Sequence, residues 1–208
     1  MVCNVKYLTI IGLMLLGVLL CTYFYVASQQ HCTFDVADIA PHLKDGDIIC
    51  RMGDRIWSRL IGEMSPNERR FSHIGIVRIE NDSIRIIHAE ALTSEQNERV
   101  NEVSLANFLV QARTVGVYRA NFIDGATLSD KATEYLGRPF DWSFDLEDES
   151  KIYCTELVYL VIKHTAPEFV PKVGFIDWHG KRVLLPNFVV ESPHFDEVLY
   201  IDVAIEKN

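Results

Sequence analysis

The chain has 208 residues, with 20 Lys and Arg against 29 Asp and Glu, which gives a formal net charge of −9. This charge and the absence of basic runs argue against nucleic acid as a partner. No CxxC motif occurs, and the His and Cys residues do not follow the spacing of a structural zinc site.

The N-terminal segment differs in composition from the rest. Residues 7–27 carry no charge and follow Lys6. As a helix with a rise of about 1.5 Å per residue, they would span roughly 32 Å, enough to cross a bilayer core. Two interpretations remain open: a secretory signal cleaved after Ala27, or an uncleaved anchor, which the aromatic residues 23–25 favour. Because Lys6 precedes the segment, we expect the following domain in the periplasm or cell envelope.

We therefore divide the chain into residues 1–30, a signal peptide or membrane anchor, and residues 31–208, a single domain. About 175 residues suit one compact domain, and no repeat or linker divides them. An oxidising compartment permits a disulfide between Cys32 and Cys50, although the spacing does not establish one. Such a bond would leave Cys154 as a free thiol.

The main domain shows alternating strand and helix patterns. The predicted elements are, in order, a strand over 47–52, a helix from Asp54 to Met64, two strands flanking Asn81 and Asp82, a helix opened by Ser104, a strand over 115–120, a helix closed by Gly137, a helix over 151–164, and a terminal strand over 198–205. This mixture predicts an α+β fold with helices packed on a small antiparallel sheet or barrel.

The strands around Asn81 predict a hairpin with candidate site residues on one face. A two-residue or four-residue loop pairs Gly75 with His88 and His73 with Glu90, whereas a three-residue loop shifts the register by one. Opposed Cβ atoms lie about 4.5–5.5 Å apart, close enough for the Glu90 carboxylate to hold the His73 imidazole. Alternation places these side chains on one face, which we expect beneath the helix that carries Cys154.

The helix over residues 151–164 places Cys154 near its start. Ser150 or Asp148 is the expected N-cap, and the helix should end at Ala166, before a proline. The helix dipole is worth roughly 0.3–1 kcal/mol to an anion, which lowers a thiol pKa by less than about one unit. A nucleophilic Cys154 therefore also needs a base from another part of the chain.

Each candidate also has an ordinary structural interpretation. A lone Cys on an apolar helix face is more often an inert core residue, and His73 could be a hydrogen-bonded sheet residue. Their combination favours a nucleophile, a base and an orienting residue, as in cysteine hydrolases. In that arrangement an ion pair with the His73 imidazolium would lower the pKa of the Cys154 thiol.

The sequence resembles a known family. FSHIGIV follows GDIICR, a second strand ends in HAEA, and YCTELVYLV follows about sixty residues later. This order resembles the circularly permuted papain-like hydrolases of the NlpC superfamily, closest to the YiiX-like branch, which is related to the lecithin:retinol acyltransferases. The resemblance covers roughly residues 41–200 and implies a papain-like α+β fold without a metal or an organic cofactor.

The resemblance also implies roles for the site residues. By position, Cys154 would be the nucleophile, His73 the base and Glu90 the third member, with His88 the rival because a histidine occupies the comparable strand in the acyltransferases. Tyr153 and His88 are the expected substrate-binding residues.

These observations predict an extracytoplasmic thiol hydrolase that forms an acyl-thioester and cleaves amide bonds. Export of an NlpC-like enzyme favours cell-wall peptides as substrates. The membrane-proximal segment and the acyltransferase kinship favour lipid acyl groups instead, and a third possibility is a binding domain that keeps the fold without catalysis.

Overall fold

The computed structural model describes residues 14–17, 19, 34–53, 62–65, 67, 69–91, 98–110 and 112–203. The chain divides into two units, Met1–Cys32 and Thr33–Asn208, close to the expected boundary after residue 30. In the first unit, residues 14–17 and 19 are helical and exposed. Within the described residues, no helix is both long and apolar enough for a membrane span. Most of the segment 7–27 lies outside them.

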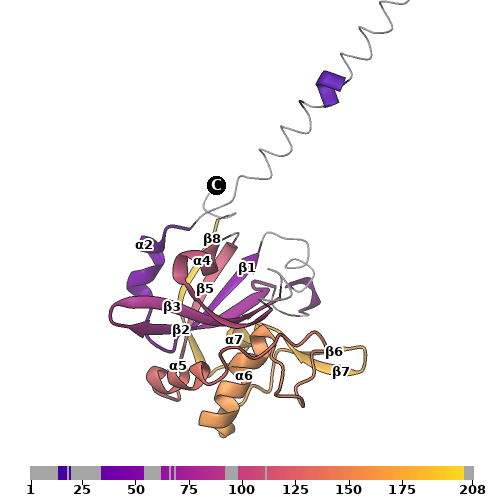
Figure 1. The fold of residues 1–208 in the computed structure, drawn as a ribbon. Helices are drawn as coiled ribbons and strands as arrows, with labels where there is room; N and C mark the ends of the chain where they lie inside the picture. The colour runs from indigo at the N-terminus through magenta and orange to yellow at the C-terminus, as the bar shows by residue number, and fades with distance from the viewer. Residues whose placement is uncertain are drawn as a thin grey trace, which may run out of the picture. The chain divides into compact units, whose positions relative to one another are not determined.

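The second unit is built on an open, six-stranded antiparallel sheet (Figure 1), which fits the predicted sheet and not the barrel alternative. Its spatial order is β4-β3-β2-β1-β5-β8. The strands are β1 (Ile48–Gly53), β2 (His73–Glu80), β3 (Ser83–Glu90), β4 (Arg99–Ser104), β5 (Ala112–Ala120) and β8 (Phe195–Asp202). A separate two-stranded sheet pairs β6 (Phe175–Trp178) with β7 (Lys181–Leu184), in a region where the sequence predicted irregular structure.

Helices cover both faces of the main sheet. The α-helices are α2 (Val36–Ile39), α4 (Leu105–Leu109), α5 (Gly125–Thr133), α6 (Cys154–Thr165) and α7 (Phe188–Glu191), and two 3-10 helices, η1 (Ala40–His42) and η2 (Pro167–Phe169), follow α2 and α6. Because strand side chains alternate, Ile74 and Ile76 pack in the core cluster formed with α5, α6 and α7. Val77 and Ile86 pack in the opposite cluster, with α2 and α4.

Most predicted elements are confirmed. Ser104 caps α4, its side chain accepting a hydrogen bond from the Asn107 N–H, and Gly137 follows α5 with a positive φ of 84°. The terminal strand is β8. The helix expected from Asp54 lies largely outside the described residues, of which 62–64 are helical.

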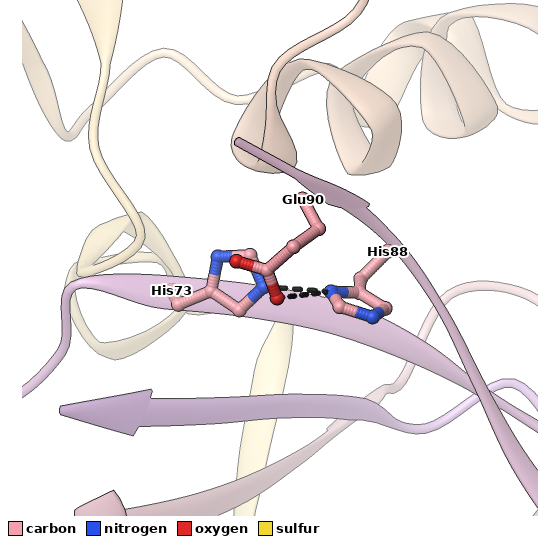
Figure 2. Close-up of side chains that lie close together, drawn as sticks. All are labelled: His73, His88 and Glu90. Atoms are coloured by element: carbon pink, nitrogen blue, oxygen red, sulfur yellow. Dashed lines mark hydrogen bonds and ion pairs between the residues drawn. The ribbon is translucent and has the colours of Figure 1, made fainter. Parts of the chain in front are cut away.

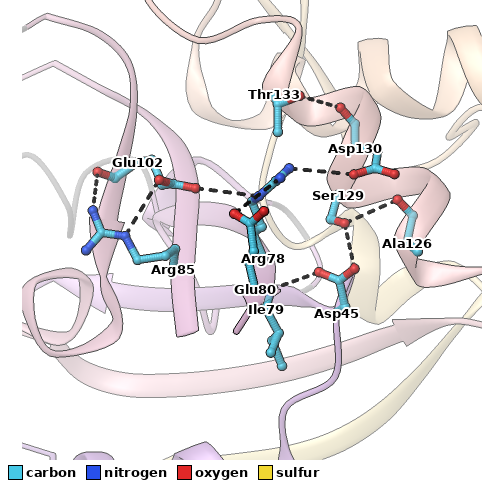
Figure 3. Close-up of polar contacts among 10 residues, drawn as sticks. All are labelled: Asp45, Arg78, Ile79, Glu80, Arg85, Glu102, Ala126, Ser129, Asp130 and Thr133. Carbon is cyan, nitrogen blue, oxygen red and sulfur yellow. Dashed lines mark hydrogen bonds and ion pairs between the residues drawn. The ribbon is translucent and has the colours of Figure 1, made fainter. Parts of the chain in front are cut away.

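Polar contacts fix β2 against its neighbours (Figure 3). The Asp45 carboxylate accepts hydrogen bonds from the Ile79 N–H at 2.9 Å and from the Ser129 hydroxyl at 2.8 Å, which joins the turn before β1 to β2 and α5. Arg78 lies between Glu102, at 4.0 Å, and Asp130, at 3.6 Å. These contacts hold the hairpin that carries the candidate site.

Candidate active site

The β2–β3 hairpin has the predicted two-residue turn and register. Asn81 and Asp82 adopt positive φ values of 49° and 61°, as a type I′ turn requires. The ladder runs from Glu80↔Ser83 to Ile76↔Ile87 and then ends. Beyond it β2 pairs with β1, and β3 with β4. The expected direct opposition of His73 and Glu90 is therefore not part of the ladder.

The side chain that contacts the His73 ring is His88, not Glu90 (Figure 2). His73 Nε2 lies 2.8 Å from His88 Nδ1, within hydrogen-bond distance. Glu90 Oε2 lies 3.7 Å from the same His88 nitrogen. Among these three residues, His88 thus lies closest to both of the others, while the ligand atoms of all three lie within 4.8 Å of one another.

Gly75 makes room for this contact between the two histidines. A Cβ atom at Gly75 would lie 2.6 Å from Ile86 Cγ2, closer than side chains tolerate, and would make a tight contact of 3.2 Å with His88 Cβ. The missing side chain allows β3 to approach β2 here, and the His88 ring fills the space beside His73. A glycine inside a strand often marks such a close approach.

Arg51 and Phe108 complete the surroundings of the histidines, and neither was predicted from the sequence. The Phe108 ring centroid lies 5.6 Å from that of His73 and 5.4 Å from that of His88. Arg51, the β1 partner of His73, places Nη2 3.4 Å from Glu90 Oε2 and its guanidinium 5.1 Å from the Phe108 ring centroid. The alternation of GDIICRM alone could not show which strand lies beside β2.

The electrostatic environment keeps both histidines neutral. Burial, aided by the nearby charge of Arg51, lowers the pKa of His88 to about 3. Burial, Arg51 and His88 likewise hold the pKa of His73 well below its ordinary value. At neutral pH His73 is therefore an uncharged imidazole that can accept a proton.

Cys154 lies in the first turn of α6, as predicted, but it is the first residue because the helix begins three residues later than expected. Tyr153 is the N-cap, in place of Ser150 or Asp148, and its N–H donates a hydrogen bond to Glu156 Oε2 at 3.2 Å. A glutamate three residues after the N-cap satisfies one backbone donor at the helix start. The C-terminal boundary at Ala166 is confirmed.

The Cys154 sulfur lies against the first residues of β2. Its contacts are the Thr155 hydroxyl, at 3.7 Å, and a backbone hydrogen bond from Ile74, the neighbour of His73. Within the described part of the chain, no hydrogen bond joins the sulfur to His73. The expectation that the histidine face lies beneath α6 is wrong, because α6 packs with Ile74 and Ile76, whereas His73 faces Phe108.

The resting site does not contain the expected ion pair. Burial raises the pKa of the Cys154 thiol to about 11, and the Glu90 charge adds to this, whereas hydrogen bonds from Thr155 and Ile74 act in the opposite direction. Both groups are therefore uncharged at neutral pH, because burial raises the pKa of the Cys154 thiol and lowers the pKa of the His73 imidazole. The thiolate would form only when a proton moves to His73.

Tyr153 and Cys50, two further residues singled out from the sequence, are buried. The Tyr153 hydroxyl accepts a hydrogen bond from the Leu184 N–H at 3.1 Å, and its side chain packs in the core, so this hydroxyl is already engaged. Cys50 is a free, fully buried thiol. It therefore forms no disulfide with Cys32, which lies outside the described residues.

The three polar residues could also bind a metal ion. His73, His88 and Glu90 each offer one ligand atom, and these atoms lie within 4.8 Å of one another. Two imidazoles and a carboxylate suit Zn²⁺ and other divalent transition metals. Arg51 near Glu90 adds a competing positive charge, but the donor set itself fits.

The fold and the site together define the class. Along the chain, the strand that begins with His73 comes before the helix that begins with Cys154. This order is the permuted papain-like arrangement. The model of the family described as permuted papain-like amidase, YaeF/YiiX, C92 family, matches residues 42–199, and the chain belongs to this family. The family confirms the predicted fold and hydrolase class.

Solved structures agree on the fold. The chain is similar to the crystal structure of the metalloprotein yiiX from Escherichia coli O157:H7, with a TM-score of 0.63 and 19% identity. The match covers 77% of this chain and 98% of that chain. A comparison with curated proteins found no match.

Proposed function

We propose that this protein is a thiol amidase in which the Cys154 sulfur attacks the amide carbonyl and His73 is the base. The observation that carries the proposal is the neutral His73 imidazole, held through Nε2 by His88 at 2.8 Å and adjacent to Ile74, which contacts the Cys154 sulfur. A cysteine, a base and an orienting group are the parts that a covalent thiol mechanism requires.

The proton positions follow from this arrangement. His73 must accept the thiol proton at Nδ1, so its own proton sits on Nε2 and is donated to His88 Nδ1. Sulfur then bonds to the carbonyl carbon, and the His73 proton passes to the leaving amine as the carbon–nitrogen bond breaks. Water, deprotonated by His73, cleaves the resulting thioester and regenerates the thiol. We therefore assign the orienting role to His88, whereas Glu90, which lies 3.7 Å from the same His88 nitrogen, takes no part in this proton relay.

The start of α6 supplies a candidate oxyanion donor. The backbone N–H of Cys154 belongs to the first turn, where helix N–H groups have no intrahelical acceptor. A donor at this position would stabilise the negative oxygen that forms as sulfur attacks.

We further propose that the substrate is a cell-wall peptide and that the enzyme works outside the cytoplasm. The amidase family supports a peptide substrate, and the uncharged segment 7–27 supports export. A lipid acyl substrate and a non-catalytic binding role remain the competing hypotheses.

One experiment separates these possibilities. The purified full chain is incubated with muropeptides and, separately, with phospholipid vesicles, and released amine and fatty acid are measured, with Cys154→Ala as the control. We expect amine release and an acyl adduct on Cys154 by mass spectrometry. Fatty acid release alone would indicate the lipid hydrolase, and neither product would indicate a binding domain.

A second candidate function, metal binding, rests on the His73, His88 and Glu90 donor set, and the similar yiiX structure is described as a metalloprotein. A bound divalent cation would supply Lewis-acid chemistry at this position. If His73 Nε2 binds the cation, its Nδ1 carries the proton and cannot accept another, so metal binding and the thiol mechanism exclude each other. Metal analysis of the purified protein and of His88→Ala tests this: stoichiometric zinc lost in the variant would favour a metal site.

A further inference from the structure

Two of the most exposed aromatic side chains lie on segments that contact each other near α6. Trp142 is 55% exposed in the loop before α6, and Trp178 is 39% exposed at the end of β6. Phe144 connects them, because its ring centroid lies 5.3 Å from that of Trp178 and 6.4 Å from that of Phe140, which contacts Trp142 at 5.1 Å. We call the rings of Trp142, Phe144 and Trp178 the aromatic patch.

The loop that carries this patch is held in a defined conformation. The buried Asp141 carboxylate accepts hydrogen bonds from the Ser143 N–H at 2.8 Å, the Ser143 hydroxyl at 2.6 Å and the Asp145 N–H at 2.6 Å. Phe144 adopts a φ of 52°, which is uncommon for a bulky residue and persists only where the surroundings impose it. Lys181 of β7 also donates to the Ser143 carbonyl at 3.1 Å.

Two independent contacts place the aromatic patch beside the candidate active site. The Phe144 ring centroid lies 5.2 Å from that of Tyr153, the residue before Cys154. On the other side, the Trp142 indole N–H donates a hydrogen bond to Glu98 Oε2 at 2.9 Å. Glu98 precedes Arg99, which pairs with Glu90 across β3 and β4. The patch therefore lies next to the N-cap of α6 and, through Glu98, next to the start of β4, the strand that pairs with β3.

The surroundings of the patch are acidic. Residues 141–148 contain four Asp and Glu residues and no Lys or Arg. Lys181, which lies opposite Trp178 across β6 and β7, is a cation next to this loop and pairs with Asp145. Glu98 binds the N–H edge of the Trp142 ring, and the Trp142 side chain is 55% exposed. A cation over an indole face gains about 0.5–2 kcal/mol, and neighbouring carboxylates add to this attraction.

We propose that the aromatic patch, together with Glu98, is a substrate subsite for a positively charged side chain or amino group near the scissile amide. This proposal rests on the proposed function, since it assumes that Cys154 attacks the substrate. It adds the substrate class, a cationic peptide, and assigns Trp142 and Trp178 as specificity residues that contact the substrate and not the reacting atoms.

Binding is measured with the full-length Cys154→Ala variant, so that no turnover is needed. Three short peptides that differ only in Lys, norleucine or Glu beside the scissile amide are titrated by calorimetry. We expect the Lys peptide to bind tightest. Trp142→Ala and Trp178→Ala should each weaken it by about 2- to 30-fold, the range a cation–π contact implies. Leu136→Ala, which removes a 42% exposed side chain on the turn after α5, is the matched control and should leave binding unchanged.

The outcomes separate this subsite from the catalytic proposal. Equal binding of the Lys and norleucine peptides, or tryptophan variants that bind as well as Leu136→Ala, would overturn the cationic subsite. In the wild-type background we expect Trp178→Ala to raise KM for the Lys peptide while kcat changes little. If wild type binds the Lys peptide through both tryptophans but cleaves no amide, the subsite stands and the thiol amidase is rejected.

Discussion

The central position of His88 decides which residue can orient the base. His88 touches His73 at 2.8 Å, whereas Glu90 lies 3.7 Å from His88 and is also bound by Arg51. Among the described residues, the Glu90 carboxylate makes no hydrogen bond to His73, and it shares its charge with Arg51. The proposed tautomer of His73 carries a proton on Nε2, and this proton needs a hydrogen-bond acceptor, which His88 Nδ1 provides.

The first prediction concerns this acceptor. His88→Asn keeps an oxygen that can accept the His73 Nε2 proton, so we expect kcat to fall by less than about tenfold. His88→Leu removes the acceptor, and kcat should fall by about 10²- to 10⁴-fold, as when a triad base loses its orienting partner. Steady-state kinetics at neutral pH provide the measurement. Equal losses in both variants would show that His88 acts through packing against Phe108.

The second prediction concerns the thiol. Because its pKa is raised to about 11, the Cys154 thiolate is scarce at pH 7 and its fraction rises about tenfold per pH unit until that value. Iodoacetamide alkylation, followed by mass spectrometry of the Cys154 peptide, should therefore be slow at pH 6 and accelerate up to pH 11. The buried Cys50 is the internal control and should stay unmodified while the domain is folded. A rate that is already maximal near pH 6 would instead indicate a thiolate–imidazolium pair.

At the scale of elements, local signals predicted more than distant ones. The β2–β3 register follows from the Asn81-Asp82 turn and the alternation of neighbouring residues, so it could be predicted and is confirmed. Arg51 and Phe108 reach the histidines from β1 and α4, whose positions depend on pairing between distant segments. The start of α6 was placed too early because Ser150 hydrogen-bonds to Asp148 instead of capping the helix.

Alternation also gave the correct grouping of His73 and His88 but not the correct side of the sheet. Which face receives α6 depends on the packing of Ile74 and Ile76 against the helix, and both faces of this strand are apolar. A strand buried on both sides carries no pattern that distinguishes them.

The third prediction concerns the start of α6. Burial raises the pKa of Glu156 to about 8, and the charges of Asp141, Asp145 and Asp148 add to this effect, while the Tyr153 N–H lowers it. A carboxyl with a raised folded-state pKa favours folding while it is protonated, so its contribution is present below pH 4.5 and is lost as pH rises toward 8. Glu156→Gln keeps an acceptor for the Tyr153 N–H and does not ionise.

We therefore expect the stability of Glu156→Gln, relative to wild type, to increase between pH 5 and pH 8. Denaturant unfolding at several pH values measures it, and both proteins should carry Cys154→Ala to avoid thiol chemistry. Parallel curves for the two proteins across this range would mean that Glu156 is already ionised in the folded state.

The fourth prediction concerns the ion pair that joins β1 to β5. Asp47 is 1% exposed and accepts two hydrogen bonds of 2.7 Å from Arg119. Asp47→Ala removes both of these charge-assisted hydrogen bonds but leaves Arg119, whose side chain is 32% exposed, in contact with solvent, so it should destabilise the domain by about 1–3 kcal/mol. Lys131→Ala, which removes an exposed pair with Glu134, should cost less than about 1 kcal/mol. Similar losses in both variants, measured by urea unfolding, would contradict the assigned role of Asp47.

On the scale of the whole molecule, the unit Thr33–Asn208 contains the candidate site and the three core clusters. Every side chain that the proposed chemistry uses is a described residue of this unit. If the first unit serves for export, its removal should change where the enzyme works and leave the chemistry unchanged.

The fifth prediction tests this division of labour. A reporter enzyme that is active only after export is fused after Asn208 and expressed with the complete chain or without residues 1–30. By the positive-inside rule we expect the uncharged segment 7–27, preceded by Lys6, to keep its N-terminal side in the cytoplasm, so the complete fusion should be active and the truncated one inactive. The truncated protein, purified from the cytoplasm without the reporter, should keep the kcat of the full chain. Equally low reporter activity in the complete and the truncated fusion would reject export. A large loss of kcat in the truncated enzyme would show that the first unit contributes to the site.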